Sequence, residues 1–63
     1  MNDERAHLLS AATSLDEITD RITMTAERLS AVGDDNAAAD LFEVERTLRN
    51  ANRRLARVVA AMR

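Results

Sequence analysis

The side chains with the clearest chemical potential in this sequence are arginines in its second half. Arg46, Arg49, Arg53 and Arg57 follow one another at steps of three and four residues, so a helix would carry them on one face, with Arg54 beside them. Such a stripe can contact the phosphates of a nucleic acid or an acidic protein surface. The competing interpretation is a solvated face that complements the negative end of a helix dipole. No aromatic residue interleaves the stripe and the net charge is −2, which favours the solvated face.

The other titratable groups form no catalytic or metal-binding pattern. His7 is the single histidine, and Asp3 and Glu4 lie at helical spacing from it, but three such groups do not specify a metal. No nucleophile or orienting partner accompanies His7 in the sequence. Glu43 and Glu45 are expected on a helix surface, whereas a di-metal bundle needs inward-facing acids. We therefore expect no catalytic residue, no cofactor-binding residue and no metal site, and a protein that is not an enzyme.

Composition limits the classes that remain. Sixty-three residues allow one small domain, and the chain has neither cysteine nor proline. No apolar run approaches the roughly 20 residues needed to cross a bilayer, and the acidic N-terminus does not resemble a secretory signal. A cytoplasmic protein without membrane contact is the expectation.

Two uninterrupted ladders of apolar and small residues must position these side chains. Each ladder alternates steps of three and four, the heptad pattern of a helix that buries one narrow stripe. The ladders predict an all-α fold, an antiparallel two-helix hairpin of coiled-coil type, with helices over 3–32 and 36–63 and a turn at 33–35. The first ladder comprises Leu8, Ala11, Leu15, Ile18, Ile22, Thr25, Leu29 and Val32, and the second Ala37, Leu41, Val44, Leu48, Ala51, Leu55, Val58 and Met62.

Local signals mark the predicted helix ends. Gly33, the only glycine, suits the left-handed position that ends a helix, and Asp34 or Asp35 can cap the helix that follows. A capping box beginning at Ser14 offers an alternative, a fresh helix start after a break near Thr13. The heptad phase runs through this site without a slip, which favours one continuous helix.

A short turn between the helices forces antiparallel packing and fixes which residues lie level. Ile22 is then expected beside Leu48, and the ladders pair in layers from Leu8 with Met62 to Val32 with Ala37. In this arrangement Asp16, Glu17 and Asp20 lie level with Arg49 to Arg53 and partly neutralise them. On one polar flank of the seam, Arg28 can pair with Asp40.

Burial along a single seam contributes little free energy compared with the cost of ordering about sixty residues, because backbone ordering costs roughly 1–2 kcal/mol per residue. A second apolar flank predicts a homodimer that forms a four-helix bundle, or the docking of a helix from a larger protein. The predicted function is a non-enzymatic protein–protein interaction or accessory scaffold protein. The alternative is a small nucleic-acid-associated regulator that uses the arginine stripe. The predicted interface residues are Leu9, Ala12, Ala26, Phe42, Ala56 and Val59.

Overall fold

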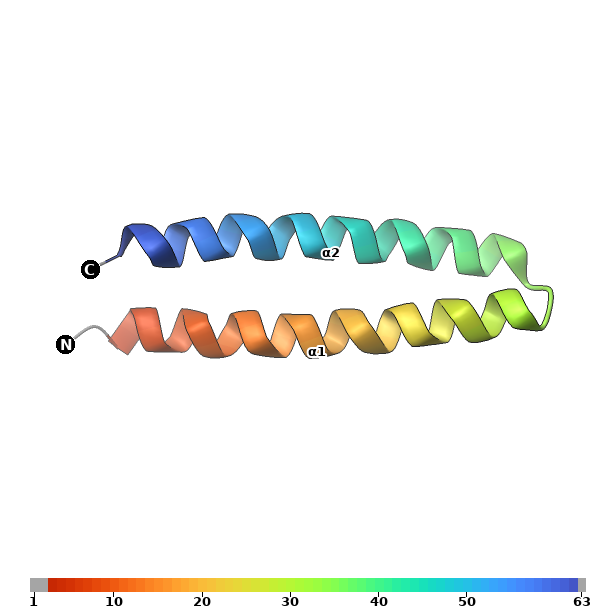
Figure 1. Ribbon diagram of the computed structural model, residues 1–63, viewed down its shortest axis with the longest axis horizontal. Coiled ribbons are helices and arrows are strands. Elements are labelled where there is room, and N and C mark those ends of the chain that lie inside the picture. Colours follow the sequence, from red (N-terminus) through yellow and green to blue (C-terminus); the bar gives the residue numbers. More distant parts are fainter. Residues whose placement is uncertain (1–2, 63) are drawn as a thin grey trace.

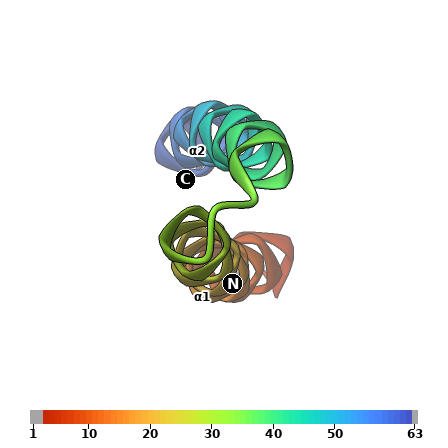
Figure 2. The same ribbon diagram turned by 90° about the vertical axis from the view of Figure 1, so that its right-hand side faces the viewer.

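The computed structural model describes residues 3–62, which form two antiparallel helices joined by a short turn (Figure 1). Helix α1 spans Asp3–Ala31 and helix α2 spans Asp35–Ala61. They pack side by side along their whole length, with the turn across one end (Figure 2), and the Cα atoms extend over 50 × 14 × 10 Å. The predicted all-helical hairpin is confirmed. The predicted second helix reaches position 63, and Arg63 lies outside the described residues.

Helix α1 continues without a break through the site at which a fresh start was the alternative. Thr13 lies inside the helix, and its hydroxyl donates to the carbonyl oxygen of Leu9 at 3.2 Å. This bond to the preceding turn lets a threonine occupy a helix interior with its hydroxyl satisfied. The capping-box sequence at Ser14 therefore does not start a helix here.

The turn satisfies the backbone groups that two helix ends leave open. Gly33 has φ of +86°, a left-handed conformation that favours glycine. The amide of Asp34 donates to the carbonyl of Leu29 at 2.9 Å and the amide of Gly33 to that of Ser30 at 3.1 Å, which is the Schellman pattern. Asp34 then caps α2, because its Oδ1 accepts from the Ala37 amide at 3.3 Å.

The stripe buried between the helices differs from the predicted seam in half of its members. The most buried described residues are Thr19, Ala26, Ala38 and Val59, all at most 5% exposed. Each directly follows a predicted seam residue, so the helices are rotated about their axes relative to the prediction. We call this the inner stripe: Leu8, Ala12, Leu15, Thr19, Ile22, Ala26 and Leu29 on α1, and Ala38, Leu41, Glu45, Leu48, Asn52, Leu55 and Val59 on α2, with Met62 directly after that helix.

The displaced half of the predicted seam lies at the surface. We call it the outer stripe: Ala11, Ile18 and Thr25 on α1 and Val32 directly after that helix, and Ala37, Val44, Ala51 and Val58 on α2. Apart from the half-buried Ala37 all are exposed, Ile18 by 42% and Val58 by 52%. Small side chains at Thr19, Ala26 and Ala38 explain the rotation, because they let the two helix backbones approach closely.

Candidate interaction surface

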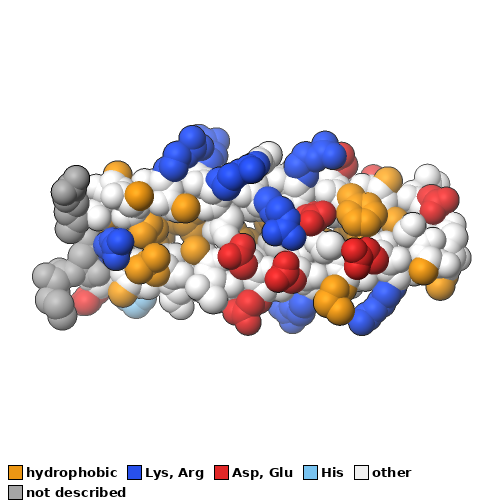
Figure 3. Space-filling model, viewed as in Figure 1, with side chains coloured by type: hydrophobic (Ala, Val, Ile, Leu, Met, Phe, Trp, Pro, Cys, Tyr) orange, Lys and Arg blue, Asp and Glu red, His pale blue; other side chains and the backbone are white. Residues whose placement is uncertain are grey.

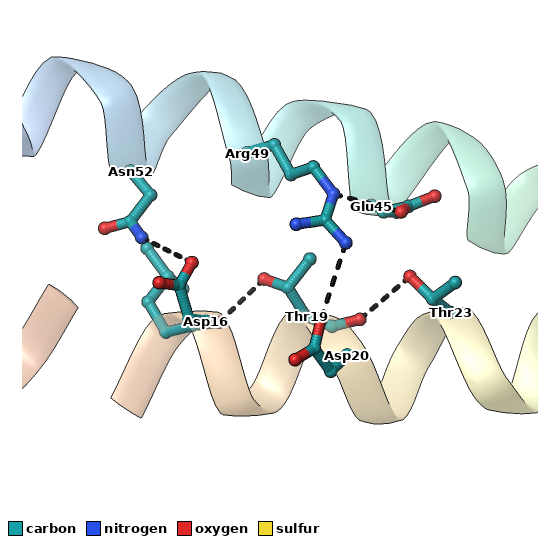
Figure 4. Close-up of polar contacts among 8 residues, drawn as sticks. Asp16, Thr19, Asp20, Thr23, Glu45, Arg49 and Asn52 are labelled. Atoms are coloured by element: carbon teal, nitrogen blue, oxygen red, sulfur yellow. Dashed lines mark hydrogen bonds and ion pairs between the residues drawn. The ribbon is translucent and has the colours of Figure 1, made fainter. Parts of the chain in front are cut away.

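One face of the hairpin carries a polar network that ties the two helices together (Figure 4). The Arg49 Nε donates to Glu45 Oε2 at 3.0 Å, and its Nη2 reaches Asp20 Oδ1 on α1 at 3.5 Å. The Asn52 Nδ2 donates to Asp16 Oδ1 at 2.8 Å and also lies 3.3 Å from the carbonyl oxygen of Ala12. Asp16 and Asp20 thus lie level with the arginine region, as the sequence predicts. Figure 3 shows acidic and basic side chains meeting over both helices on this face.

The two central charges of this network stabilise each other. Hydrogen bonding from the Thr23 side chain and from Arg49 lowers the pKa of the Glu45 carboxyl below its usual 4.5. The hydrogen bond to Glu45 raises the pKa of the Arg49 guanidinium, and Asp20 adds to the effect. Both groups therefore hold their charges at neutral pH, which suits a structural ion pair rather than the proton transfer of an acid–base catalyst.

The predicted arginine stripe divides into two parts. Arg46 pairs with Glu43 at 3.2 Å, and Arg49 belongs to the network, so acids neutralise this half. The other half of the arginine stripe, together with Asn50, lines a shallow concavity on the side of α2 that points away from α1. Arg53 Nη2 donates to Asn50 Oδ1 there. Within residues 3–62 no acid forms an ion pair with any member of this half, which comprises Arg53, Arg54 and Arg57.

The structure separates the residues that the sequence assigns to an interface. Leu9, Phe42 and Ala56 are exposed. Ala26 and Val59 are buried inside the hairpin, and the half-buried Ala12 also belongs to the inner stripe. As a correction, Ala26 and Val59 contact the other helix of their own chain, so they are not available to a second chain unless the hairpin opens. The cause is the rotation of both helices about their axes.

The largest set of exposed apolar residues lies instead on the outer stripe. In both helices each outer-stripe residue from Ala11 to Thr25 and from Ala37 to Val58 directly precedes an inner-stripe residue. Because the helices have the same hand and run antiparallel, these residues emerge on one face of the hairpin. A groove on this face is lined by Ile18 and Thr25 of the outer stripe together with Ile22 and Leu41, and Arg21 lies at its margin.

Sequence reasoning missed the outer stripe as an open surface because it assigned these residues to the hairpin seam. The signal for the alternative was the series of small residues at one heptad position, Ala12, Thr19 and Ala26 in α1 and Ala38 in α2. Only small side chains at such positions allow the closest approach of two helices, so this series marked the side on which the chain packs against itself.

Other features of the described chain suggest no further site. His7 is exposed on α1. Within residues 3–62 no three His, Cys, Asp or Glu side chains are grouped so that they could hold a metal ion. Neither helix, over the same residues, combines the length and apolarity that crossing a membrane requires. No protein-family model, no curated protein and no solved structure matches this chain.

Proposed function

We propose that this chain is a non-enzymatic assembly protein that self-associates into a four-helix bundle through its outer stripe. One observation carries the proposal: the hairpin buries small residues such as Thr19 and Ala26 and leaves the larger Ile18, Val44 and Val58 at least 42% exposed. Fully burying a large aliphatic side chain contributes roughly 1.5–3 kcal/mol. A second copy that covers this face therefore adds the burial free energy of the apolar surface that the single hairpin leaves exposed to water. The bundle then offers its remaining faces to other proteins as a scaffold.

The first test is the mass in solution. Sedimentation or light scattering at micromolar concentration is expected to give twice the 7.0 kDa of the chain. Ile18→Asp is expected to give a monomer, because a charge on the outer stripe would be buried unpaired in the dimer. Met24→Asp is the matched control, since Met24 is also an apolar residue of α1 and is 50% exposed, but lies outside both stripes.

Two outcomes would contradict the proposal. A well-folded monomeric wild-type chain removes the self-association, and an Ile18→Asp variant that remains dimeric removes the outer stripe as the interface. Phe42→Asp distinguishes the two exposed apolar regions, because Phe42 lies among the side chains of the network face, beside Arg46 and Arg49. It is expected to leave the dimer intact, and a monomeric Phe42→Asp variant would favour the surface that carries Leu9, Phe42 and Ala56.

The second candidate function is nucleic-acid association. The arginines of α2 that form no ion pair within residues 3–62 support it. Arg53, Arg54 and Arg57 gather around one concavity, and a dimer would carry this group twice. A protein that contacts phosphates loses affinity steeply as salt rises, so binding to generic DNA and RNA between 50 and 200 mM salt, as typical conditions, tests it. Salt-independent retention, or retention unchanged in Arg53→Glu/Arg57→Glu, would contradict it. Met24→Asp again serves as a control away from the cluster.

A further inference from the structure

We infer that the second copy packs on the outer stripe with its turn at the same end, so that the twofold axis runs parallel to the helices. This inference rests on the proposed self-association. Two face-to-face arrangements are open to a hairpin dimer. With the turns at the same end, α1 of one copy lies over α2 of the other. With the turns at opposite ends, α1 lies over α1 and α2 over α2.

The outer-stripe face is large enough for a stable dimer. The hairpin extends 50 Å by 14 Å across this face, which corresponds to about 700 Å² for each copy before side chains are added. A standard protein–protein interface buries roughly 800 Å² on each partner. The apolar residues run along most of the length, from Val32 and Ala37 near the turn to Ala11 and Val58 near the open end. A second copy of equal length covers this stripe from end to end.

The same-end arrangement pairs a larger aliphatic side chain with alanine in three of its four outer-stripe layers. The contact between Arg49 and Asp20 sets the level of α2 relative to α1 within the chain, and a twofold axis parallel to the helices keeps that level between copies. Ile18 then faces Ala51 of the partner subunit. In the same way Val58 lies level with Ala11, Val44 with Thr25, and Val32 with Ala37. Alternation of large and small residues across facing positions is what close packing favours.

Charges at the rim favour the same arrangement. Arg28 and Asp40 lie level with each other on the polar edges of the outer-stripe face, and the sequence suggests that they pair within the chain. Within residues 3–62 no ion pair joins them. The same-end dimer brings Arg28 beside Asp40 of the partner subunit, twice by symmetry. The opposite-end dimer instead runs the two α1 helices antiparallel, so Arg28 lies level with the His7 and Ser14 end of the same rim in the partner subunit and gains no acidic partner.

A distance measurement between the two turns tests the arrangement. The chain contains no cysteine, so Asn36→Cys places one spin label on each chain at an exposed position beside the turn. In the same-end dimer the label separation is expected to be ~30 Å or less, because packed helix axes lie about 8–10 Å apart. In the opposite-end dimer it approaches the 50 Å length of the hairpin. A label at Asn50→Cys, near the middle of the bundle, reports the dimer in either arrangement.

The outcomes separate the two proposals. No dipolar coupling from either label, together with a monomeric mass, overturns the self-association itself. Coupling at Asn50→Cys with a turn-to-turn distance near 50 Å overturns only the same-end arrangement. A short distance at Asn36→Cys supports it.

A charge swap provides an independent reading of the same interface. In the same-end dimer Arg28→Asp and Asp40→Arg are each expected to weaken dimerisation several-fold, since each places like charges together twice. Mixing the two variants, or combining them in one chain, restores opposite charges across the interface and is expected to restore the affinity. In the opposite-end dimer Arg28 and Asp40 do not meet, so neither variant is expected to weaken dimerisation and mixing them changes nothing. Dimerisation that neither variant weakens, or no recovery on mixing, would overturn the inference.

Discussion

Two neighbouring valines of α2 test directly which stripe packs inside the hairpin. Val59 is 5% exposed and Val58 is 52% exposed, although the residue type and the helix are the same. Truncating Val59 to alanine removes two buried carbons, which costs about 1.6 kcal/mol at roughly 0.8 kcal/mol per carbon, plus any residual cavity. The higher helix propensity of alanine returns up to about 0.7 kcal/mol. The net loss for Val59→Ala is therefore about 1 kcal/mol or more.

The same calculation predicts almost no effect at the neighbouring position in the isolated hairpin. Val58 is only about half buried, so Val58→Ala costs about 0.8 kcal/mol, which the gain in helix propensity of up to ~0.7 kcal/mol nearly offsets. For a domain of this size 1 kcal/mol corresponds to a shift of about 4–8 °C in Tm. Val59→Ala is thus expected to lower Tm by several degrees, and Val58→Ala by little.

The assay is thermal or urea unfolding followed by circular dichroism in an Ile18→Asp background, which suppresses self-association. In the otherwise wild-type chain Val58→Ala is expected to destabilise only where the protein is dimeric, so its effect fades on dilution while that of Val59→Ala persists. A loss for Val58→Ala that equals or exceeds that of Val59→Ala in the monomeric background would refute the inner stripe and restore the seam predicted from sequence.

Three further expectations follow from the turn, the buried threonine and the ion network. Gly33→Ala is expected to destabilise by about 1–2 kcal/mol, because φ is +86° while an added Cβ meets nothing within 4 Å; a synthetic chain with D-alanine there should keep its urea midpoint, and equal losses for both enantiomers would contradict this reasoning. Thr19→Val is expected to leave the urea midpoint unchanged or raise it, since the hydroxyl of Thr19 bonds only the Leu15 carbonyl of its own helix, at 2.7 Å, and a clear loss of stability would contradict that. The pKa of Glu45 is lowered from 4.5 in the folded chain, so the ionised carboxylate contributes its full stabilisation of the fold above pH 4.5. This contribution is lost as pH falls through the lower pKa of the folded state. Tm is accordingly expected to fall on acidification below about pH 5, and Glu45→Gln should flatten this fall; a slope unchanged in Glu45→Gln would exclude the carboxylate as its source.

The parts of the fold that were predicted correctly depend on short stretches of sequence. The helix ends follow from Gly33, whose missing Cβ permits a positive φ, and from Asp34, whose carboxylate caps the next helix. The relative level of the helices follows from the length of the turn, and the contact between Arg49 and Asp20 agrees with it. Such features need no knowledge of how the helices are rotated about their axes.

The rotation of the helices was the part that periodicity left undecided. Leu15, Ile22 and their heptad equivalents belong both to the inner stripe and to the seam predicted from sequence, so steps of three and four fit the two equally well. Apolar content alone favours the predicted seam, because the inner stripe contains Glu45 and Asn52. Two other factors decide the rotation. The backbones approach closely at the small residues, and the side chains of Glu45 and Asn52 can reach hydrogen-bonding groups at the edge of the seam. Neither quantity can be read from spacing.

The same ambiguity is an argument for the bundle. A helix in a two-stranded coiled coil needs one apolar stripe, whereas a helix in a four-helix bundle contacts two neighbours roughly a quarter-turn apart and needs two adjacent stripes with a shared central row. The row of Leu15, Ile22 and Leu29 is shared in this way in α1, with Thr19 on its inner side and Ile18 on its outer side. A hairpin that functioned alone would gain nothing from apolar side chains on the outer side, and they would lower its solubility. Two fitting heptad patterns in one helix are therefore the sequence signature expected when each helix packs against one neighbour in its own chain and one in a second copy.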